Sequence, residues 1–170
     1  MNESKGYFSK YILKPLAAWA ALVAVDQASK YIVKASLIPG ETKAVAPFFN
    51  LTHLTNTGMA FSMFQGANVV FMTFTFVVLT GIAVWFAKNA PKLEPLAATA
   101  VVLIAAGAAG NLIDRILSGH VTDFLDFYAG SYHWPSFNAA DSCISVGGCL
   151  LFIWIVMPSK GKEINVPDNN

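Results

Sequence analysis

The chain has 170 residues, of which 55% are hydrophobic and 12% charged, and its formal net charge is +1. Soluble domains carry about 25% charged residues, so this composition indicates a membrane protein, and the length suits one small bundle of spans. The near-neutral charge, with only scattered lysines, argues against a nucleic-acid partner.

Four apolar segments are each long enough to cross a bilayer, which takes about 20 helical residues. They are residues 12–33, 68–87, 96–117 and 139–157. The first resembles a secretory signal peptide because lysines precede a short apolar run. The apolar stretch resumes after Asp26, however, and three more spans follow it. The sequence therefore predicts an all-α membrane protein with four transmembrane helices, in which residues 1–170 form a single domain.

The lysines and arginine predict the orientation of these spans. With an even number of spans, both termini and the turn at residues 88–95 share one side. That side holds Lys5, Lys10, Lys14, Lys88, Lys92, Lys160 and Lys162, and the other holds Lys30, Lys34, Lys43 and Arg115. Because cytoplasmic segments are enriched in lysine and arginine, we expect both termini in the cytoplasm and the loops 35–67 and 118–138 outside.

The first outer loop has its own structural signal. Residues 45–54 are apolar, β-branched and aromatic, a composition typical of a strand. The sequence therefore predicts a small β segment lying at the outer membrane interface. In the second loop, the aromatic residues Tyr128, Tyr132 and Trp134 suit the same interface.

Polar residues gather at the outer ends of the predicted spans. They include the aspartates Asp26, Asp114, Asp123, Asp126 and Asp141. A charge near hydrocarbon is expensive, so such residues usually face a polar cavity and act there. A carrier would more often place its ionisable groups near the midplane between repeated halves, and the sequence shows no internal repeat.

Two carboxylates that share one proton can activate water, polarise a carbonyl and protonate a leaving nitrogen. Asp123 lies in the second outer loop and Asp141 opens the fourth span, so the two can meet at its mouth. Spacing alone leaves two alternatives open. Either aspartate can instead cap a helix or sit in a surface turn. Asp126, three residues after Asp123, is a third candidate for the pair.

Several neighbouring residues have both a structural and a functional interpretation. Asn138 lies three residues before Asp141 and suits either a helix cap or a contact to the carboxylate. Asn111 and Arg115 share a helix face, and Asp114 can pair with a cation. We interpret these last three as scaffold and substrate contacts, with a purely structural ion pair as the alternative.

Asp26 and Lys30 are four residues apart in the favourable order for a helical ion pair. This spacing favours a structural role at the end of the first span, with direct substrate contact as the alternative. Other hydrolase signatures are missing, because the chain has no GxSxG or HExxH motif, and Ser118 and His120 are poorly spaced for a serine mechanism. The sequence contains no cysteine–histidine cluster, so we expect no metal site.

These motifs resemble, in order and over almost the whole chain, those of the bacterial lipoprotein signal peptidases, also called signal peptidase II. The matching blocks are residues 26–30, 56–62, 110–115, 119–124 and 137–141. Met59 replaces the small residue usual in the second block. Asp126 falls outside all five blocks, and we predict that it is a solvated or lysine-paired surface charge.

The resemblance implies an aspartyl endopeptidase of the bacterial inner membrane. It would remove the signal peptide from prolipoproteins by cleaving before a diacylglyceryl-modified cysteine, without a metal or organic cofactor. The catalytic residues would be Asp123 and Asp141. The supporting or substrate-binding residues would be Asn56, Asn111, Arg115, Asn138, Asp114, Asp26 and Lys30. Membrane lipids and the cyclic peptide inhibitor globomycin are further expected partners. The alternative is a non-enzymatic membrane carrier or lipoprotein-assembly subunit.

Overall fold

The computed structural model describes residues 8–57 and 68–157 of the chain. A π-helical turn, η1 (Ser9–Leu13), runs into the helix α2 (Lys14–Ser36), and the other long helices are α3 (Asn68–Asn89), α4 (Pro95–Ser118) and α5 (Ala139–Val156). A short 3-10 turn, η2 (Ala90–Lys92), joins α3 to α4. All four helical segments are long and apolar enough to cross a membrane. The four spans expected from the sequence are therefore confirmed as helices, with ends that differ by a few residues.

A small antiparallel sheet accompanies the helices. Its strands are β1 (Thr42–Ala46), β2 (Phe49–Asn56), β3 (Val121–Ala129) and β4 (Tyr132–His133), paired in the order β1-β2-β3-β4. The predicted β segment is thus confirmed, and it corresponds largely to β2. The predicted outer loop at residues 118–138 contains two further strands, β3 and β4, which the sequence did not predict.

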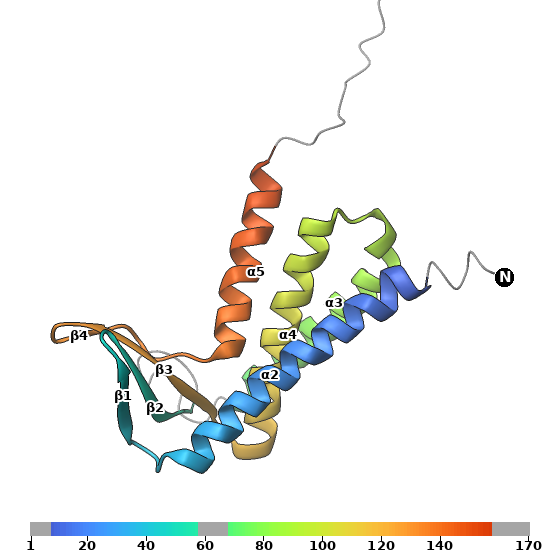
Figure 1. Cartoon of the computed structure of the whole chain (residues 1–170). Coiled ribbons are helices and arrows are strands. Elements are labelled where there is room, and N and C mark those ends of the chain that lie inside the picture. The colour runs from blue at the N-terminus through green and yellow to red at the C-terminus, as the bar shows by residue number, and fades with distance from the viewer. Residues whose placement is uncertain (1–7, 58–67, 158–170) are drawn as a thin grey trace, which may run out of the picture.

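The sheet lies at one end of the helical bundle, where α2 and α4 finish and α5 begins (Figure 1). We call this the sheet end. The α3–α4 turn and the start of α2 lie at the opposite end (Figure 1). Local signals determine where the helices end or begin at the sheet end. Helix α4 stops at Gly119, which has the left-handed φ of 74° that glycine tolerates. Asn138 caps the start of α5.

Helix α4 is the centre of the bundle and contacts each of the other three long helices. It packs closely on α5 through small residues. A Cβ on Gly147 would lie 2.9 Å from the carbonyl oxygen of Ala100 and 2.8 Å from Cγ1 of Ile104. Such small-residue contacts let membrane helices approach and gain van der Waals energy. Helix α3 differs, because none of its residues is buried in the described structure.

A compact hydrophobic cluster fastens the sheet to the bundle. Val33 and Leu37, at the end of α2, are buried against Phe124 of β3. Phe124 and Asp123 are successive residues of a strand, so their side chains point to opposite faces. The apolar face of β3 is therefore held by α2, while its other face carries Asp123 toward the start of α5.

Candidate active site

Asp123 and Asp141 are brought together by a single asparagine. Asn138 Nδ2 donates to Asp123 Oδ1 over 2.8 Å, and Asn138 Oδ1 accepts from the backbone nitrogen of Asp141 over 2.9 Å. The Asp141 carboxylate in turn accepts from the backbone nitrogen of Asn138 over 3.2 Å. The pairing expected from the sequence thus corresponds to a continuous hydrogen-bonded unit. Asn138 fulfils both of its interpretations, since it is a helix cap and a contact to a carboxylate.

Each carboxylate has an asparagine donor on its remaining oxygen. Asn56 Nδ2 donates to Asp123 Oδ2 over 3.0 Å, and Asn111 Nδ2 donates to Asp141 Oδ1 over 2.8 Å. Asn56 is near the end of β2, which pairs with β3, and Asn111 lies in α4. Three asparagines from three elements therefore fix the orientation of the two carboxyl groups.

The environment of Asp123 favours its protonated form. The pKa of Asp123 is raised to about 6, and burial of the carboxyl is the largest cause. The neighbouring charge of Asp141 also raises it, whereas hydrogen bonds from Asn56 and Asn138 and the charge of Lys30 act in the opposite direction. A carboxyl group with this pKa can hold a proton close to neutral pH and donate it during a reaction.

Beside the two carboxylates lies a buried cluster centred on Lys30. Its ammonium group contacts Asp26 Oδ2 at 2.9 Å, Asp114 Oδ2 at 3.0 Å and Asn111 Oδ1 at 3.0 Å. The Lys30 side chain is only 1% exposed. An ammonium has three N–H donors, so these three partners satisfy it completely. The helical Asp26–Lys30 pair expected from the sequence is confirmed, and the cation that pairs with Asp114 is Lys30.

The two acids of this cluster also hold the backbone next to Asp123 and Asp141. Asp26 Oδ1 accepts from the backbone nitrogen of Ala140 over 2.9 Å, and Asp114 Oδ2 accepts from that of Thr122 over 3.2 Å. Ala140 precedes Asp141, and Thr122 precedes Asp123. The Lys30 cluster therefore holds α5 and β3 together at the residues that precede Asp141 and Asp123.

Gln27 is a member of this cluster that the sequence did not single out. Its side-chain amide donates to Asp26 Oδ2 over 3.1 Å, to Asp114 Oδ1 over 3.3 Å and to the Gly110 carbonyl oxygen over 3.1 Å. Gln27 follows Asp26 directly in the motif at residues 26–30, and this position was the one feature of the sequence that could have indicated its role. Its bonds join α2 to α4 in parallel with Lys30.

Arg115, near the pair, has incomplete hydrogen bonding. Its Nη1 reaches the Asn111 carbonyl oxygen at 3.4 Å, and its buried Nε has no hydrogen-bond partner. It forms no ion pair with a carboxylate within residues 8–57 and 68–157. Asp123 and Asp141 nevertheless interact with it electrostatically. Among the described residues, Arg115 thus has an unsatisfied Nε and no carboxylate partner.

The prediction that Asp126 is a solvated or lysine-paired surface charge was wrong. Asp126 is 5% exposed and accepts hydrogen bonds from Asn50 Nδ2 and His133 Nδ1, both over 2.8 Å. Burial alone would raise its pKa, but the hydrogen bonds and the attraction of His133 outweigh burial and hold the pKa of Asp126 below its usual value. It joins β2, β3 and β4, and within residues 8–57 and 68–157 no hydrogen bond or ion pair links it to the Asp123–Asp141 unit.

Among the residues that the structure describes, no group of histidine, cysteine, aspartate and glutamate is arranged to hold a metal ion. Met59 and most of the motif at residues 56–62 lie outside the described residues, and Asn56 is the member of that motif whose contact is seen.

A family model described as Signal peptidase (SPase) II matches residues 18–157. The chain belongs to the signal peptidase II family. The matched region includes all four long helices except the start of α2, and it contains every residue of the Asp123–Asp141 unit.

Individual members of the signal peptidase II family cover most of the chain. A lipoprotein signal peptidase of Hydrogenovibrio crunogenus is 44% identical over 141 residues, which are 79% of this chain and 81% of that protein. One of Janthinobacterium sp. is 40% identical over 167 residues, which are 95% of this chain and 100% of that protein.

A solved structure described as a bacterial membrane enzyme is 31% identical, with a TM-score of 0.80. The match covers 91% of this chain and 94% of the chain in that structure. The arrangement of four helices and a sheet is therefore shared with a membrane enzyme.

Proposed function

We propose that this signal peptidase II is an aspartyl endopeptidase that removes the signal peptide from prolipoproteins by cleaving before the diacylglyceryl-modified cysteine. The observation that carries the proposal is the Asn138 bridge, which joins two carboxyl groups into one unit. Two carboxyl groups held in this way can share one proton and divide the acid and base roles between them.

The raised pKa of Asp123 supports one division of these roles. The shared proton resides on Asp123, which donates a hydrogen bond to the carbonyl oxygen of the scissile peptide bond. Asp141 takes a proton from a water molecule, whose oxygen then forms a bond to the carbonyl carbon. The tetrahedral intermediate collapses as the C–N bond breaks, and the leaving nitrogen receives a proton from the pair. The mechanism requires no metal because the two carboxyl groups supply both acid and base.

The other polar residues divide into three groups. We assign Arg115, whose Nε has no partner, and Asn56, which contacts Asp123, to binding of the substrate backbone or the glyceryl group. Asn111 and Asn138 position the carboxylates directly. Asp26, Lys30 and Asp114 act through them, by holding the start of α5 and the start of β3.

The positive charges favour an orientation with the sheet end on the outer side of the bacterial inner membrane. Lys10, Lys14, Lys88 and Lys92 lie in η1, at the start of α2 and beside the α3–α4 turn, at the opposite end, which is therefore cytoplasmic. The scissile bond of a membrane-anchored prolipoprotein would then meet the carboxyl pair near the outer interface. Globomycin, a cyclic peptide, would inhibit the enzyme by occupying the same site.

The test is cleavage by the purified full-length protein in detergent. A diacylglyceryl-modified prolipoprotein is the substrate, and the same precursor without the lipid is the control. We expect a new amino terminus at the lipidated cysteine, identified by mass spectrometry, and loss of this product with Asp123→Asn or Asp141→Asn.

A non-enzymatic carrier or assembly subunit would show no product and would tolerate both substitutions. Membership of a peptidase family argues against this alternative.

A further inference from the structure

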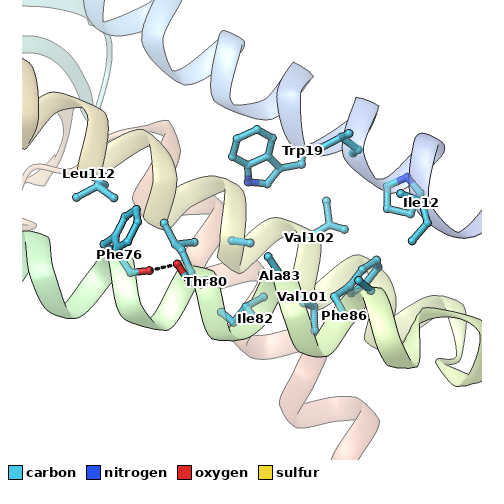
Figure 2. A pocket seen from close by; sticks show the side chains of 15 residues that line it. Ile12, Trp19, Phe76, Thr80, Ile82, Ala83, Phe86, Val101, Val102 and Leu112 are labelled. Carbon is cyan, nitrogen blue, oxygen red and sulfur yellow. Dashed lines mark hydrogen bonds between the residues drawn. The ribbon is translucent and has the colours of Figure 1, made fainter.

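Helix α2 borders one groove toward α3 and another toward α4, and the two differ in charge. The groove toward α3 is lined by side chains such as Trp19 and Phe76, and among the described residues no charged one lines it (Figure 2). The groove toward α4 has Lys10 and Lys14 among its lining residues. We call it the lysine groove, because it combines apolar walls with positive charge.

The lysine groove has a charged end and an apolar body. Lys14, Ala18 and Leu22 of α2 line it at intervals of four residues, so they share one face of the helix. Lys10 continues this row in η1, whose π-helical form frequently marks functional sites. The α4 wall consists of Ala98, Thr99, Val102 and Leu103. The Thr99 hydroxyl donates to a backbone carbonyl of its own helix over 2.8 Å and is thereby satisfied.

The positive charge of the groove is not neutralised by the described chain. Within residues 8–57 and 68–157, neither Lys10 nor Lys14 forms an ion pair with a carboxylate. Lys10 Nζ lies 5.0 Å from the centroid of the Tyr11 ring, which carries no charge at neutral pH. The described carboxylate at this end of the bundle is Glu94, which accepts from Trp154 Nε1 of α5 over 3.1 Å. The two ammonium groups can therefore bind an anion from outside the chain.

The groove lies where no polar bond is seen between α2 and α4. In the described part of the chain, the hydrogen bonds and ion pairs between these helices all come from Gln27 and Lys30, near the sheet end. Leu22, the groove residue nearest that end, lies five residues before Gln27. Both helices are long and apolar enough to cross a membrane, so the groove between them faces hydrocarbon. A ligand in the groove would hold the helices together where Gln27 and Lys30 do not reach.

We propose that the lysine groove binds one anionic phospholipid of the membrane leaflet at that end. Its phosphate contacts the ammonium groups of Lys10 and Lys14, and one of its acyl chains lies between α2 and α4. Lysine is a good phosphate ligand, and its aliphatic stem can follow an apolar surface while its charge stays at the interface. A zwitterionic phospholipid fits less well, because its own ammonium group is repelled by the two lysines. In the orientation proposed above, this leaflet is the cytoplasmic one.

The first test measures lipid binding to the full-length protein. The protein in detergent is titrated with phosphatidylglycerol or with phosphatidylcholine of the same acyl chains, and the bound lipids are counted by native mass spectrometry. The test variant carries Lys10→Gln and Lys14→Gln. The matched control carries Lys88→Gln and Lys92→Gln, which remove the same charge from the same end at residues that do not line the groove.

We expect the parent to bind one phosphatidylglycerol at least about tenfold more tightly than phosphatidylcholine. The Lys10 and Lys14 variant should lose roughly thirtyfold in this affinity, since each lysine near an anionic lipid contributes about fivefold. The Lys88 and Lys92 control should lose less than about threefold, because charges outside the groove are screened by salt. An equal loss in the control overturns the inference, because the attraction would then be diffuse. Equal affinity of the parent for the two lipids also overturns it.

Ala18→Trp tests whether an acyl chain occupies the groove. Ala18 lines the groove, whereas its neighbour Ala17 is exposed and does not, so Ala17→Trp is the matched control. We expect Ala18→Trp to lower the affinity for phosphatidylglycerol at least about tenfold, the loss of roughly two buried CH₂ groups. Ala17→Trp should keep the parent affinity. An unchanged affinity in Ala18→Trp overturns the inference, and so does a dimer in the native spectra that Ala18→Trp disrupts, because a second copy would then occupy the groove.

A thermal measurement tests the consequence for the two helices. In lipid nanodiscs, the unfolding temperature of the parent should be at least about 3 °C higher with phosphatidylglycerol than with phosphatidylcholine. The difference should disappear in the Lys10 and Lys14 variant and persist in the Lys88 and Lys92 control. A difference that is the same in all three proteins overturns the inference. The inactive Asp141→Asn protein should show the parent's difference, so the lipid site is tested independently of the proposed peptidase activity.

Discussion

Lys30 Nζ donates to Asn111 Oδ1 over 3.0 Å, and this bond decides which way the Asn111 amide faces. Because its oxygen is held by an ammonium, its nitrogen must point the other way, where it donates to Asp141 over 2.8 Å. Lys30 therefore acts on Asp141 through one intervening side chain, without touching it. The interpretation of Lys30 as a structural residue is incomplete, since its structure-holding bonds also orient a proposed catalytic group.

Amidation of either proposed catalytic residue should abolish cleavage. We expect Asp123→Asn and Asp141→Asn each to lower kcat at least about a hundredfold, the lower end for a lost general acid or base. Their yield in the membrane and elution volume in detergent should match the parent. Substantial turnover by either purified variant would remove that residue from the proposed pair.

Asp126→Asn is the matched control for these two, because it makes the same change on the same strand as Asp123. We expect cleavage within about tenfold of the parent, since the side-chain hydrogen bonds seen for Asp126 come from Asn50 and His133 and not from the Asp123–Asp141 unit. The loss should appear in thermal stability, at about 1.5–3 kcal/mol for a hydrogen bond to a charged group. A variant as inactive as Asp123→Asn, with Asp141→Asn still active, would move the pair to Asp123 and Asp126.

The low pKa of Asp126 also makes a pH prediction. A carboxyl group whose folded pKa lies below its unfolded value stabilises the protein above the unfolded pKa, about 3.9, and loses that contribution as pH falls through the folded value. The difference in unfolding temperature between the parent and Asp126→Asn should therefore be largest near neutral pH and shrink below about pH 4. A difference that is constant from pH 7 to about pH 3 would contradict this account.

The raised pKa of Asp123 sets the pH dependence of cleavage. The pair is competent while Asp123 keeps its proton, so kcat/KM should fall as pH rises through about 6. Bound substrate buries the carboxyl further, so the corresponding fall in kcat should occur at higher pH. The measurement is initial rate against pH in one detergent. A kcat/KM that rises steadily to pH 9 would require a different base.

Lys30→Met should affect both stability and the pH profile. It leaves Asp26 and Asp114 buried without a cation, and breaking a buried ion pair typically costs about 3–5 kcal/mol. Because the charge of Lys30 lowers the pKa of Asp123, its loss should move the falling limb of kcat/KM to higher pH. If Lys30 were only structural, its replacement would reduce the amount of folded enzyme and leave the falling limb of kcat/KM at the same pH.

The double variant Lys30→Met with Asp114→Asn separates the two effects. It removes one positive and one negative charge, so the remaining cluster carries the same net charge as the original. We expect it to recover part of the stability lost in Lys30→Met. The orientation of Asn111 is still lost, so kcat should remain well below that of the parent.

The helices and the pairing of Asp123 with Asp141 could be predicted from the sequence, but β3 could not. A strand with one solvated face alternates apolar and polar residues, whereas β3 is covered on both faces. Phe124 is buried against α2 and Asp123 against the start of α5. Without alternation, the strand could not be distinguished from an interfacial loop. The error about Asp126 has the same origin. Without the pairing of β3 with β2 and β4, nothing in the sequence indicated that Asn50 and His133 would lie beside Asp126.

The Lys30 cluster shows a second limit of the sequence. Helical spacing predicts the pair of Asp26 and Lys30, because the two are one turn apart. No local rule predicts that Asp114, 84 residues later than Lys30, completes the cluster from another helix. The backbone bonds from Ala140 and Thr122 depend on the packing of α2, α4 and α5 and likewise leave no trace in spacing.

The Asp26–Lys30 pair has a consequence for biosynthesis. The two charges lie on one helix and are 2.9 Å apart, so the first span enters the bilayer as a neutral unit at that depth. Asp114 arrives only when the third span is made, and Asp141 with the fourth. A partly synthesised chain thus carries Asp26 and Lys30 as a neutral ion pair in the membrane, and it lacks part of the Asp123–Asp141 unit. By the proposed roles of Asp123 and Asp141, the enzyme acquires the ability to cut other chains only when its own last helix has been inserted.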